Sequence, residues 1–320
     1  MRARFVSILI LGLCLISVIV GLLTLSSQEK EKKACPEPSK TPILEKLSAG
    51  GNKIALITLH GVITYNMKSS FLGDVNSAEG ALKALKKASK DKSVKGVIFR
   101  INSPGGTVAM SQEIHNSIMR LREKKPVVVS MADVAASGGY YVASAADRIY
   151  ANPGSLTGSI GVIMETINAR GLLTEKLGVE SEIIKSGKYK DTGNIYRPLS
   201  NDERELLNNL INNAYIQFLN AIKEGRVARE DEYKLKKVEL TEKKLKKYSD
   251  GRIFTGDQAV EYGFVDHLGG LAQAKDGVRQ MAKEKFPFIS DDIPVVDYNK
   301  PSGFSKFLLR LSNRFLPPLQ

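Results

Sequence analysis

Residues 134–141 have the sequence Val-Ala-Ala-Ser-Gly-Gly-Tyr-Tyr, and the rest of the chain is organised around them. The apolar residues 126–131 before them predict a buried strand, and the apolar residues 140–146 predict the first turns of a helix. Ser137 therefore stands where a strand ends and a helix begins. That position exposes its hydroxyl and points backbone N–H groups at whatever binds in front of it. A tight turn with a capping serine is the simpler alternative.

A second glycine-rich stretch has the same context. Residues 100–106, Arg-Ile-Asn-Ser-Pro-Gly-Gly, follow the apolar residues 96–99 and precede a helix predicted over residues 108–124. Two strand ends of this kind, each with paired glycines opening a helix, can face one substrate carbonyl. One then supplies a nucleophile and an N–H group, and the other supplies a second N–H group, which is the geometry of an oxyanion hole.

The hydrophobic pattern alternates between strand and helix periods along the chain. Strands are predicted at residues 54–64, 94–101, 126–131, 148–151, 158–163 and 180–184. Helices are predicted at residues 77–90, 108–124 and 169–178, and a long helix opens at Ser200 with a capping box to Glu203. Strands that alternate with helices predict an α/β domain with parallel pairing.

The N-terminus has the pattern of a membrane anchor. Arg2 and Arg4 precede residues 5–25, a run of about 21 residues without a charge, which at ~1.5 Å per residue spans a hydrocarbon core of ~30 Å. A buried core helix is the alternative, and the exit of the run is a poor match to a signal-peptide cleavage site. The arginines predict a cytoplasmic N-terminus and an extracytoplasmic catalytic domain in the cell membrane. The net charge of +13 then fits anionic lipid better than nucleic acid.

Four segments follow from this pattern. We expect a cytoplasmic stub and anchor at residues 1–27, a linker at 28–52, a catalytic domain at 53–290 and a tail at 291–320. Apolar residues at helical spacing near the end of the tail, with three basic side chains on another face, predict an amphipathic helix. That helix either packs on the domain or lies on an anionic membrane surface or a neighbouring subunit.

A serine hydroxyl needs a base before it becomes a good nucleophile. The chain has three histidines, His60, His115 and His267, and none stands in a context that indicates a partner for Ser137. A Ser-His-Asp arrangement is the less favoured alternative. The two cysteines do not have metal-ligand spacing, so neither a metal nor a cofactor is expected.

Lysine is the other available base. Its ordinary pKa of ~10.4 must fall for this role, and burial of the charged form or neighbouring cations lower it. Lys185, Lys188 and Lys190 lie in one loop after a predicted strand. A basic surface loop is the alternative. If the Asp191 and Lys190 side chains pair, that pairing argues against Lys190 as the general base, because it keeps the lysine protonated.

Four motifs in this order resemble the signal peptide peptidase A family. They are NSPGG at residues 102–106, AASGGYY at 135–141, TGSIGV at 157–162 and SGKYKD at 186–191. Members of this family are membrane-anchored Ser-Lys peptidases, distantly related to Clp protease subunits and crotonases. The resemblance covers about residues 54–271, and the length is similar to the single-domain form of the family. It implies an α/β fold of the crotonase and Clp protease type with an N-terminal transmembrane helix.

This resemblance assigns roles to individual residues. It implies that Ser137 is the nucleophile, Lys190 the general base, and the N–H groups of Gly106 and Gly138 the oxyanion hole, while Ser159 helps to orient the lysine. It also implies a ring-like oligomer that cleaves remnant signal peptides. In the tandem relatives the lysine and the serine lie in different repeats, so a one-repeat chain is expected to supply them from two protomers.

We therefore expect a membrane-anchored serine endopeptidase that degrades peptide fragments through an acyl-enzyme. Its expected partners are peptides, membrane lipid and other copies of itself, and not nucleic acid. A crotonase-like acyl-CoA enzyme, which would use the two N–H groups to hold an enolate, is one alternative, but an external site has no obvious supply of acyl-CoA. A membrane-anchored scaffold without chemistry is another, and the intact Ser137 and Lys190 weigh against it.

Overall fold

The computed structural model describes residues 51–65, 75–227 and 239–299. The chain divides into two units after Gly51, and the described helices and strands all belong to the second unit. The expected membrane anchor, nearly all of the expected linker and the expected tail helix lie outside the described residues. Within those residues, no helix is both long enough and apolar enough to cross a membrane.

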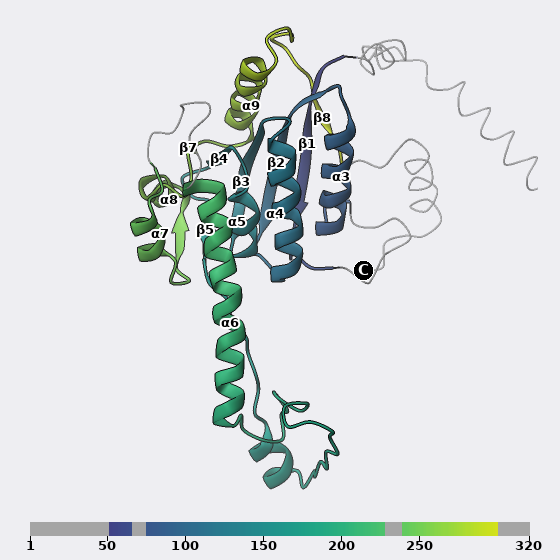
Figure 1. Cartoon of the computed structure of the whole chain (residues 1–320), viewed down its shortest axis with the longest axis vertical. Coiled ribbons are helices and arrows are strands. Elements are labelled where there is room, and N and C mark those ends of the chain that lie inside the picture. The colour runs from purple at the N-terminus through teal and green to yellow at the C-terminus, as the bar shows by residue number, and fades with distance from the viewer. Residues whose placement is uncertain (1–50, 66–74, 228–238, 300–320) are drawn as a thin grey trace, which may run out of the picture. The chain divides into compact units, whose positions relative to one another are not determined.

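A mixed β-sheet forms the centre of the domain (Figure 1). Its strands in the described residues are β1 (Lys53–His60), β2 (Val94–Ser103), β3 (Val127–Ala136), β4 (Arg148–Ala151), β5 (Leu156–Gly158), β6 (Ile253–Thr255), β7 (His267–Leu268) and β8 (Val295–Asp297). The order is β6-β5-β3-β2-β1-β8, and β4 pairs with β3 and with β7. The pairs are parallel except for β5 with β6, which confirms the predicted parallel α/β pattern.

Helices cover both faces of this sheet. They are α3 (Ala78–Lys90), α4 (Val108–Arg122), α5 (Gly138–Ala143), α6 (Asn201–Ile222), α7 (Glu242–Tyr248), α8 (Gly256–Tyr262) and α9 (Leu271–Lys285), with short π-helices η1 (Gly171–Lys176) and η2 (Lys223–Val227). Alternate residues of β2 enter different cores: Val97 and Phe99 pack with α3 and α4, whereas Ile98 packs with α9. This follows from the two-residue period of a strand buried on both faces.

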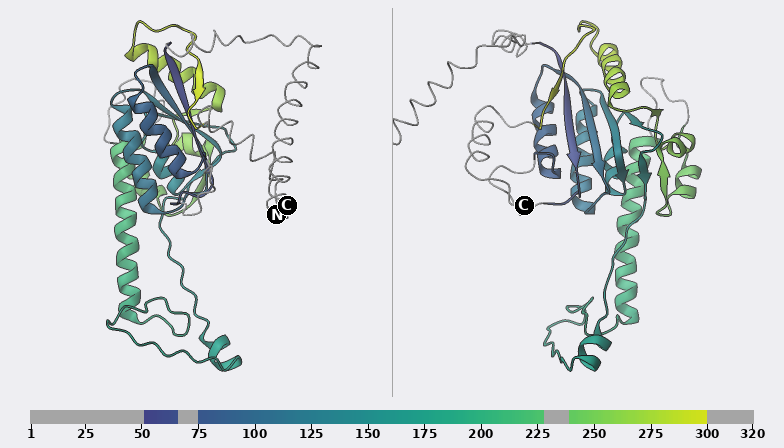
Figure 2. Two further views of the ribbon diagram at one scale, coloured as in Figure 1. Left: turned by 90° about the vertical axis from the view of Figure 1, so that its right-hand side faces the viewer. Right: turned by 180° about the vertical axis from the view of Figure 1, so that it is seen from behind.

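Residues 163–200 and the N-terminal part of α6 form an arm that extends from the sheet (Figures 1 and 2). Many of its apolar side chains are exposed, including Ile163 and Ile184 at 94% each and Leu210 at 54%. The buried apolar side chains of α6 lie near its C-terminal end, at Phe218, Ala221 and Ile222. The arm thus leaves a large apolar surface uncovered in the single chain.

Three local predictions in this region were wrong. The strand expected at residues 180–184 is irregular, because those residues have no strand partner among the described residues. The strand expected at 158–163 ends at Gly158, whose positive φ of 81° turns the chain. The helix expected at 169–178 is limited to the six residues of η1. An apolar pattern alone therefore does not make a strand where no neighbouring strand completes its hydrogen bonds.

Candidate active site

Ser137 lies between β3 and α5, which confirms its predicted place at a strand-to-helix junction. Its backbone has φ 52° and ψ −119°. Among the described non-glycine residues, only Ser137 and Ser159 have a positive φ, 52° and 51° respectively. Such conformations cost energy and are held by the surrounding structure, most often at functional sites. Both strained serines are residues that the sequence motifs singled out.

Strand β5 holds the two serines near each other. The Ser137 N–H donates to the Gly158 carbonyl at 2.8 Å, at the end of the parallel pairing between β3 and β5. The next residue, Ser159, donates its own N–H to the Arg252 carbonyl at 2.7 Å. A single short strand therefore fixes the backbone on which both hydroxyl groups are carried.

The two glycine loops are in direct contact. A Cβ built on Gly105, which has a φ of 107°, would lie 2.7 Å from the Gly138 nitrogen, and a Cβ on Gly138 would lie 3.1 Å from the Gly106 nitrogen. Side chains at these positions would separate the loops, so glycine is required for the close approach. Neither the Gly106 nor the Gly138 N–H donates a hydrogen bond to a described residue. The pair is therefore available to an oxyanion.

A contact with Ile63 fixes the first of these loops. The Ile63 N–H donates to the Gly105 carbonyl at 2.8 Å, and the Thr107 N–H donates to the Ile63 carbonyl at 2.7 Å. The Ser103 hydroxyl also accepts from the Gly105 N–H at 3.1 Å. These bonds set the direction of the peptide groups on both sides of Gly106 without using its N–H.

Ser137, Gly106, Gly138 and Ser159 all line one cavity of about 460 Å³. Its wall is otherwise mainly apolar, and the residues with this role are Val108, Tyr141, Val162, Ile163, Ala214 and Phe218. The structure thus brings together four of the five residues that the sequence predicted. Tyr141 belongs to the serine motif, whereas Phe218 comes from α6, and none of the sequence motifs includes it.

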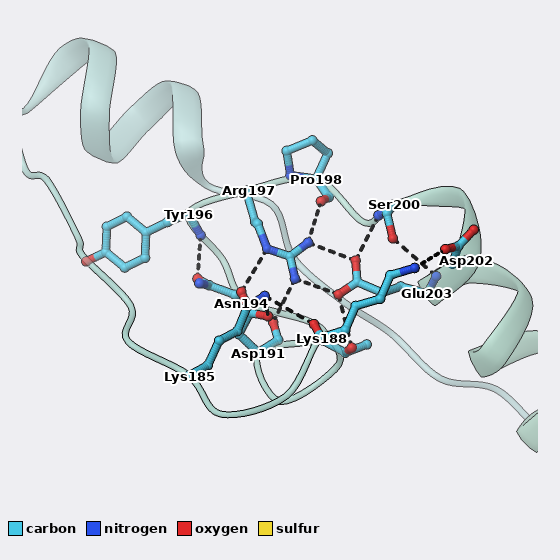
Figure 3. Close-up of polar contacts among 11 residues, drawn as sticks. Lys185, Lys188, Asp191, Asn194, Tyr196, Arg197, Pro198, Ser200, Asp202 and Glu203 are labelled. Carbon is cyan, nitrogen blue, oxygen red and sulfur yellow. Dashed lines mark hydrogen bonds and ion pairs between the residues drawn. The ribbon is translucent and has the colours of Figure 1, made fainter.

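Lys190 does not line this cavity. It lies exposed in the loop of the arm that precedes α6, and within the described residues its amine makes no hydrogen bond or ion pair. The other two lysines of the loop are paired (Figure 3): Lys185 with Asp191 at 2.5 Å, and Lys188 with Asp202. The hydrogen bond from Lys188 to Asp202 raises the pKa of Lys188. Lys190 is thus the lysine of this loop whose amine forms no ion pair with a described carboxylate.

None of the three histidines lies where it could serve Ser137 as a base in place of Lys190. None of the three lines the cavity. His115 is buried in α4, where its ring meets the ring of Tyr141 edge-on at 5.3 Å and burial lowers its pKa. His267 packs against the ring of Tyr150 at 5.0 Å. A Ser-His-Asp arrangement around Ser137 is therefore not present among the described residues. These residues also contain no group of three His, Cys, Asp or Glu side chains suited to a metal ion.

Comparison with known proteins shows the family to which this chain belongs. The chain belongs to peptidase family S49, whose model matches residues 119–285, and the Clp protease model matches residues 67–156. A candidate protease of Synechocystis sp. is 41% identical over 227 residues, covering 68% of this chain and 77% of the relative. A candidate signal peptide peptidase SppA of Enterococcus faecium is 33% identical, covering 92% and 83%. A candidate protease of Methanocaldococcus jannaschii is 36% identical, covering 75% and 74%.

These matches confirm the expected family of signal peptide peptidases A. The chain is a serine peptidase with a mixed α/β fold of the Clp protease and crotonase type. An acyl-CoA enzyme or a scaffold without chemistry is correspondingly disfavoured.

Proposed function

We propose that the chain is a membrane-anchored serine endopeptidase that degrades remnant signal peptides and other peptide fragments with a Ser137–Lys190 dyad. One observation carries the proposal: the strained Ser137 lines the same cavity as Gly106 and Gly138, whose N–H groups donate to no described residue. Its apolar wall suits the apolar side chains in which signal peptides are rich. A relative that covers most of the chain is named for the same activity.

In this mechanism neutral Lys190 takes the Ser137 proton while the serine oxygen attacks the peptide carbonyl carbon. The oxyanion that forms accepts hydrogen bonds from the Gly106 and Gly138 N–H groups. The lysine ammonium then gives its proton to the departing amine, which leaves an acyl-serine ester. Water attacks the ester while Lys190 takes up a water proton, and that proton returns to the serine oxygen as the acid product leaves. Ser159, beside Ser137 on the cavity wall, orients the lysine.

The Lys190 that serves a given Ser137 comes from a neighbouring copy in a homo-oligomer. Two observations support this arrangement. Lys190 does not line the cavity of its own chain, and the arm that carries it exposes large apolar side chains such as Leu172 at 59% and Ile184 at 94%. An uncovered apolar surface of this kind is typical of a contact with another protein. A second copy that covers the arm would bring its base to a serine in the same step.

Anchoring is proposed from the sequence. The uncharged residues 5–25 span the cell membrane, with the N-terminus in the cytoplasm and the catalytic domain outside. Peptide fragments left in or near the membrane would then diffuse to the site over a short distance. Membrane lipid is the second partner in this proposal.

Complementation between two inactive variants tests the dyad and its sharing together. Ser137→Ala and Lys190→Ala should each lower peptidase activity by about 10²–10⁴-fold or more, whereas Lys188→Ala is the matched control and should be milder. In verified mixed oligomers, roughly a quarter of the head-to-tail interfaces would pair an intact serine with an intact lysine. Recovery of activity on that scale is expected. An active Lys190→Ala protein would contradict the base, and mixing without recovery would contradict the sharing.

A further inference from the structure

Arg197 joins the lysine loop to the first turn of α6 (Figure 3). Its guanidinium donates from Nη1 and Nη2 to the two oxygens of Glu203, at 2.8 and 2.5 Å, and from Nε to Oδ2 of Asp191 at 2.9 Å. A planar fork of donors suits two carboxylates in this way, which a lysine in the same place does not. Arg197 thus holds two acidic side chains, and the sequence motifs gave no role to it.

Glu203 is buried and accepts several of the hydrogen bonds in this cluster. It is 2% exposed, and its Oε2 also accepts from the Ser200 N–H at 2.8 Å in the capping box of α6. Its Oε1 accepts from the Thr192 hydroxyl at 3.0 Å. A buried carboxylate with this many donors is held firmly in one position. Both ends of the segment from Thr192 to Arg197 are therefore tied to the start of a long helix.

Arg197 also binds the carboxylate of Asp191, the residue next to Lys190. One Asp191 oxygen accepts from Lys185 at 2.5 Å and the other from Arg197 at 2.9 Å. Hydrogen bonds from Arg197 and Lys185 hold the pKa of Asp191 well below its ordinary value. Both of its oxygens are thus engaged by cations other than Lys190. An unpaired carboxylate beside a lysine favours the protonated lysine, which cannot act as a base.

We propose that Arg197, fixed by Glu203, is a positioning residue that holds the Asp191 carboxylate away from Lys190 and so leaves Lys190 free to act as the general base. The inference rests on the proposed Ser137–Lys190 dyad and extends it. It assigns a function to an ion-pair cluster that would otherwise only connect a loop to a helix.

The other charged side chains near the loop do not share the role proposed for Arg197. On the loop, Lys188 is engaged by Asp202 of α6. The segment that precedes η1 contacts the loop through Ala169, whose N–H donates to the Ile195 carbonyl at 2.8 Å, and its charged residues are Glu165 and Arg170. Neither of those two side chains forms an ion pair with a described residue of the loop.

The pH dependence of kcat/KM for peptide cleavage by the full chain tests the proposal. In the parent protein the rate should rise with pH as the base loses its proton. Arg197→Gln should move the midpoint of this rise upward by about one pH unit, so the rate on the acid side falls about tenfold. The alkaline plateau should stay within about threefold of the parent. A residue that only stabilises the fold would lower the whole profile instead.

Removal of the carboxylate gives the rescue. Arg197→Gln combined with Asp191→Asn should return the midpoint to the parent value or below, because no carboxylate is left beside the lysine. Lys188→Gln is the matched control, since it breaks an ion pair of the same loop without touching Asp191, and its midpoint should equal the parent's. Lys185→Gln removes the other cation at Asp191 and should raise the midpoint by a smaller amount. If Arg197→Gln does not fold, the midpoint of Lys185→Gln tests the proposal in its place.

Two outcomes overturn the proposal: a parent-like midpoint in Arg197→Gln (or in Lys185→Gln, if Arg197→Gln does not fold), or a double variant that behaves like Arg197→Gln alone. Lys190→Ala separates this failure from failure of the dyad. If Lys190→Ala is inactive and Arg197→Gln has the parent profile, only the positioning role is refuted. If Lys190→Ala keeps its activity, the dyad itself is refuted and the positioning role with it.

Discussion

Replacement of Ser137 by Gly rather than by Ala is predicted to give the more stable of two inactive proteins. Ser137 has φ 52° and ψ −119°, a conformation open to glycine that costs a residue with a Cβ about 1–3 kcal/mol. Glycine loses about 0.5–1 kcal/mol of this gain because its unfolded chain has more freedom. Taken at the middle of both ranges, Ser137→Gly should therefore be about 1 kcal/mol more stable than Ser137→Ala. Both variants lack the hydroxyl, so chemistry does not enter the comparison.

Denaturant and thermal unfolding of the two full-length variants measure this difference, at about 2–4 °C per kcal/mol for a domain of this size. Ser144 provides the matched control. It is also a buried serine at an end of α5, but its φ of −61° and ψ of −20° are helical. There glycine should be about 1 kcal/mol less stable than alanine. The same pair of substitutions should thus have opposite signs at two positions in one turn region.

A Ser137→Gly protein that is no more stable than Ser137→Ala, beside a Ser144 pair that behaves as expected, would contradict this prediction. That result would mean that the backbone at Ser137 carries no strain in solution. The junction between β3 and α5 would then relax without cost.

Three further predictions concern other parts of the domain. Gly106→Ala places a Cβ against the Ile63 carbonyl and should lower kcat by about 10²–10³-fold by moving an oxyanion donor, whereas Gly154→Ala, with open space around it, should have parent kinetics. Burial raises the pKa of Asp91, but hydrogen bonds to its carboxylate outweigh burial and leave that pKa well below its ordinary value. Asp91→Asn should therefore lower the free energy of unfolding by about 1 kcal/mol at pH 7. Unfolding measured at several pH values should show that this difference shrinks below about pH 4, where the carboxylate of the unfolded parent chain begins to take up its proton. Leu210→Asp adds a charge to an exposed apolar side chain of the arm and should reduce the oligomer mass measured by light scattering; an unchanged mass would contradict assembly through α6.

Local signals predicted the serine half of the site. The junction at Ser137 follows from an apolar strand, a pair of glycines and an apolar helix within about 20 residues. The capping box between Ser200 and Glu203 is likewise a four-residue pattern, and it is present as predicted. Such features depend on neighbours in sequence, so a sequence pattern is enough to find them.

Sequence patterns could not predict which side chains form ion pairs in the lysine loop. Asp191 lies within seven residues of Lys185, Lys188, Lys190 and Arg197, and no spacing rule selects among these cations. The choice depends on how the loop closes against α6, which in turn depends on the buried Glu203. The arm presents the same difficulty at a larger scale. Its apolar residues have the composition of a core, but the residues that would cover them are not next to them in the chain.

The two halves of the proposed dyad depend on different forces. Ser137 is set by a sheet whose neighbouring residues, such as Ala135 and Tyr140, are fully buried, and apolar burial is hardly affected by ionic strength. The loop that carries Lys190 is held by ion pairs, and those between exposed side chains, such as Lys188 with Asp202, are screened by salt. A single chain then holds the proposed oxyanion hole without the proposed base at its cavity. If the base arrives only with a neighbouring copy, assembly creates the activity, and a newly made protomer cannot cleave peptides before it has reached its partners.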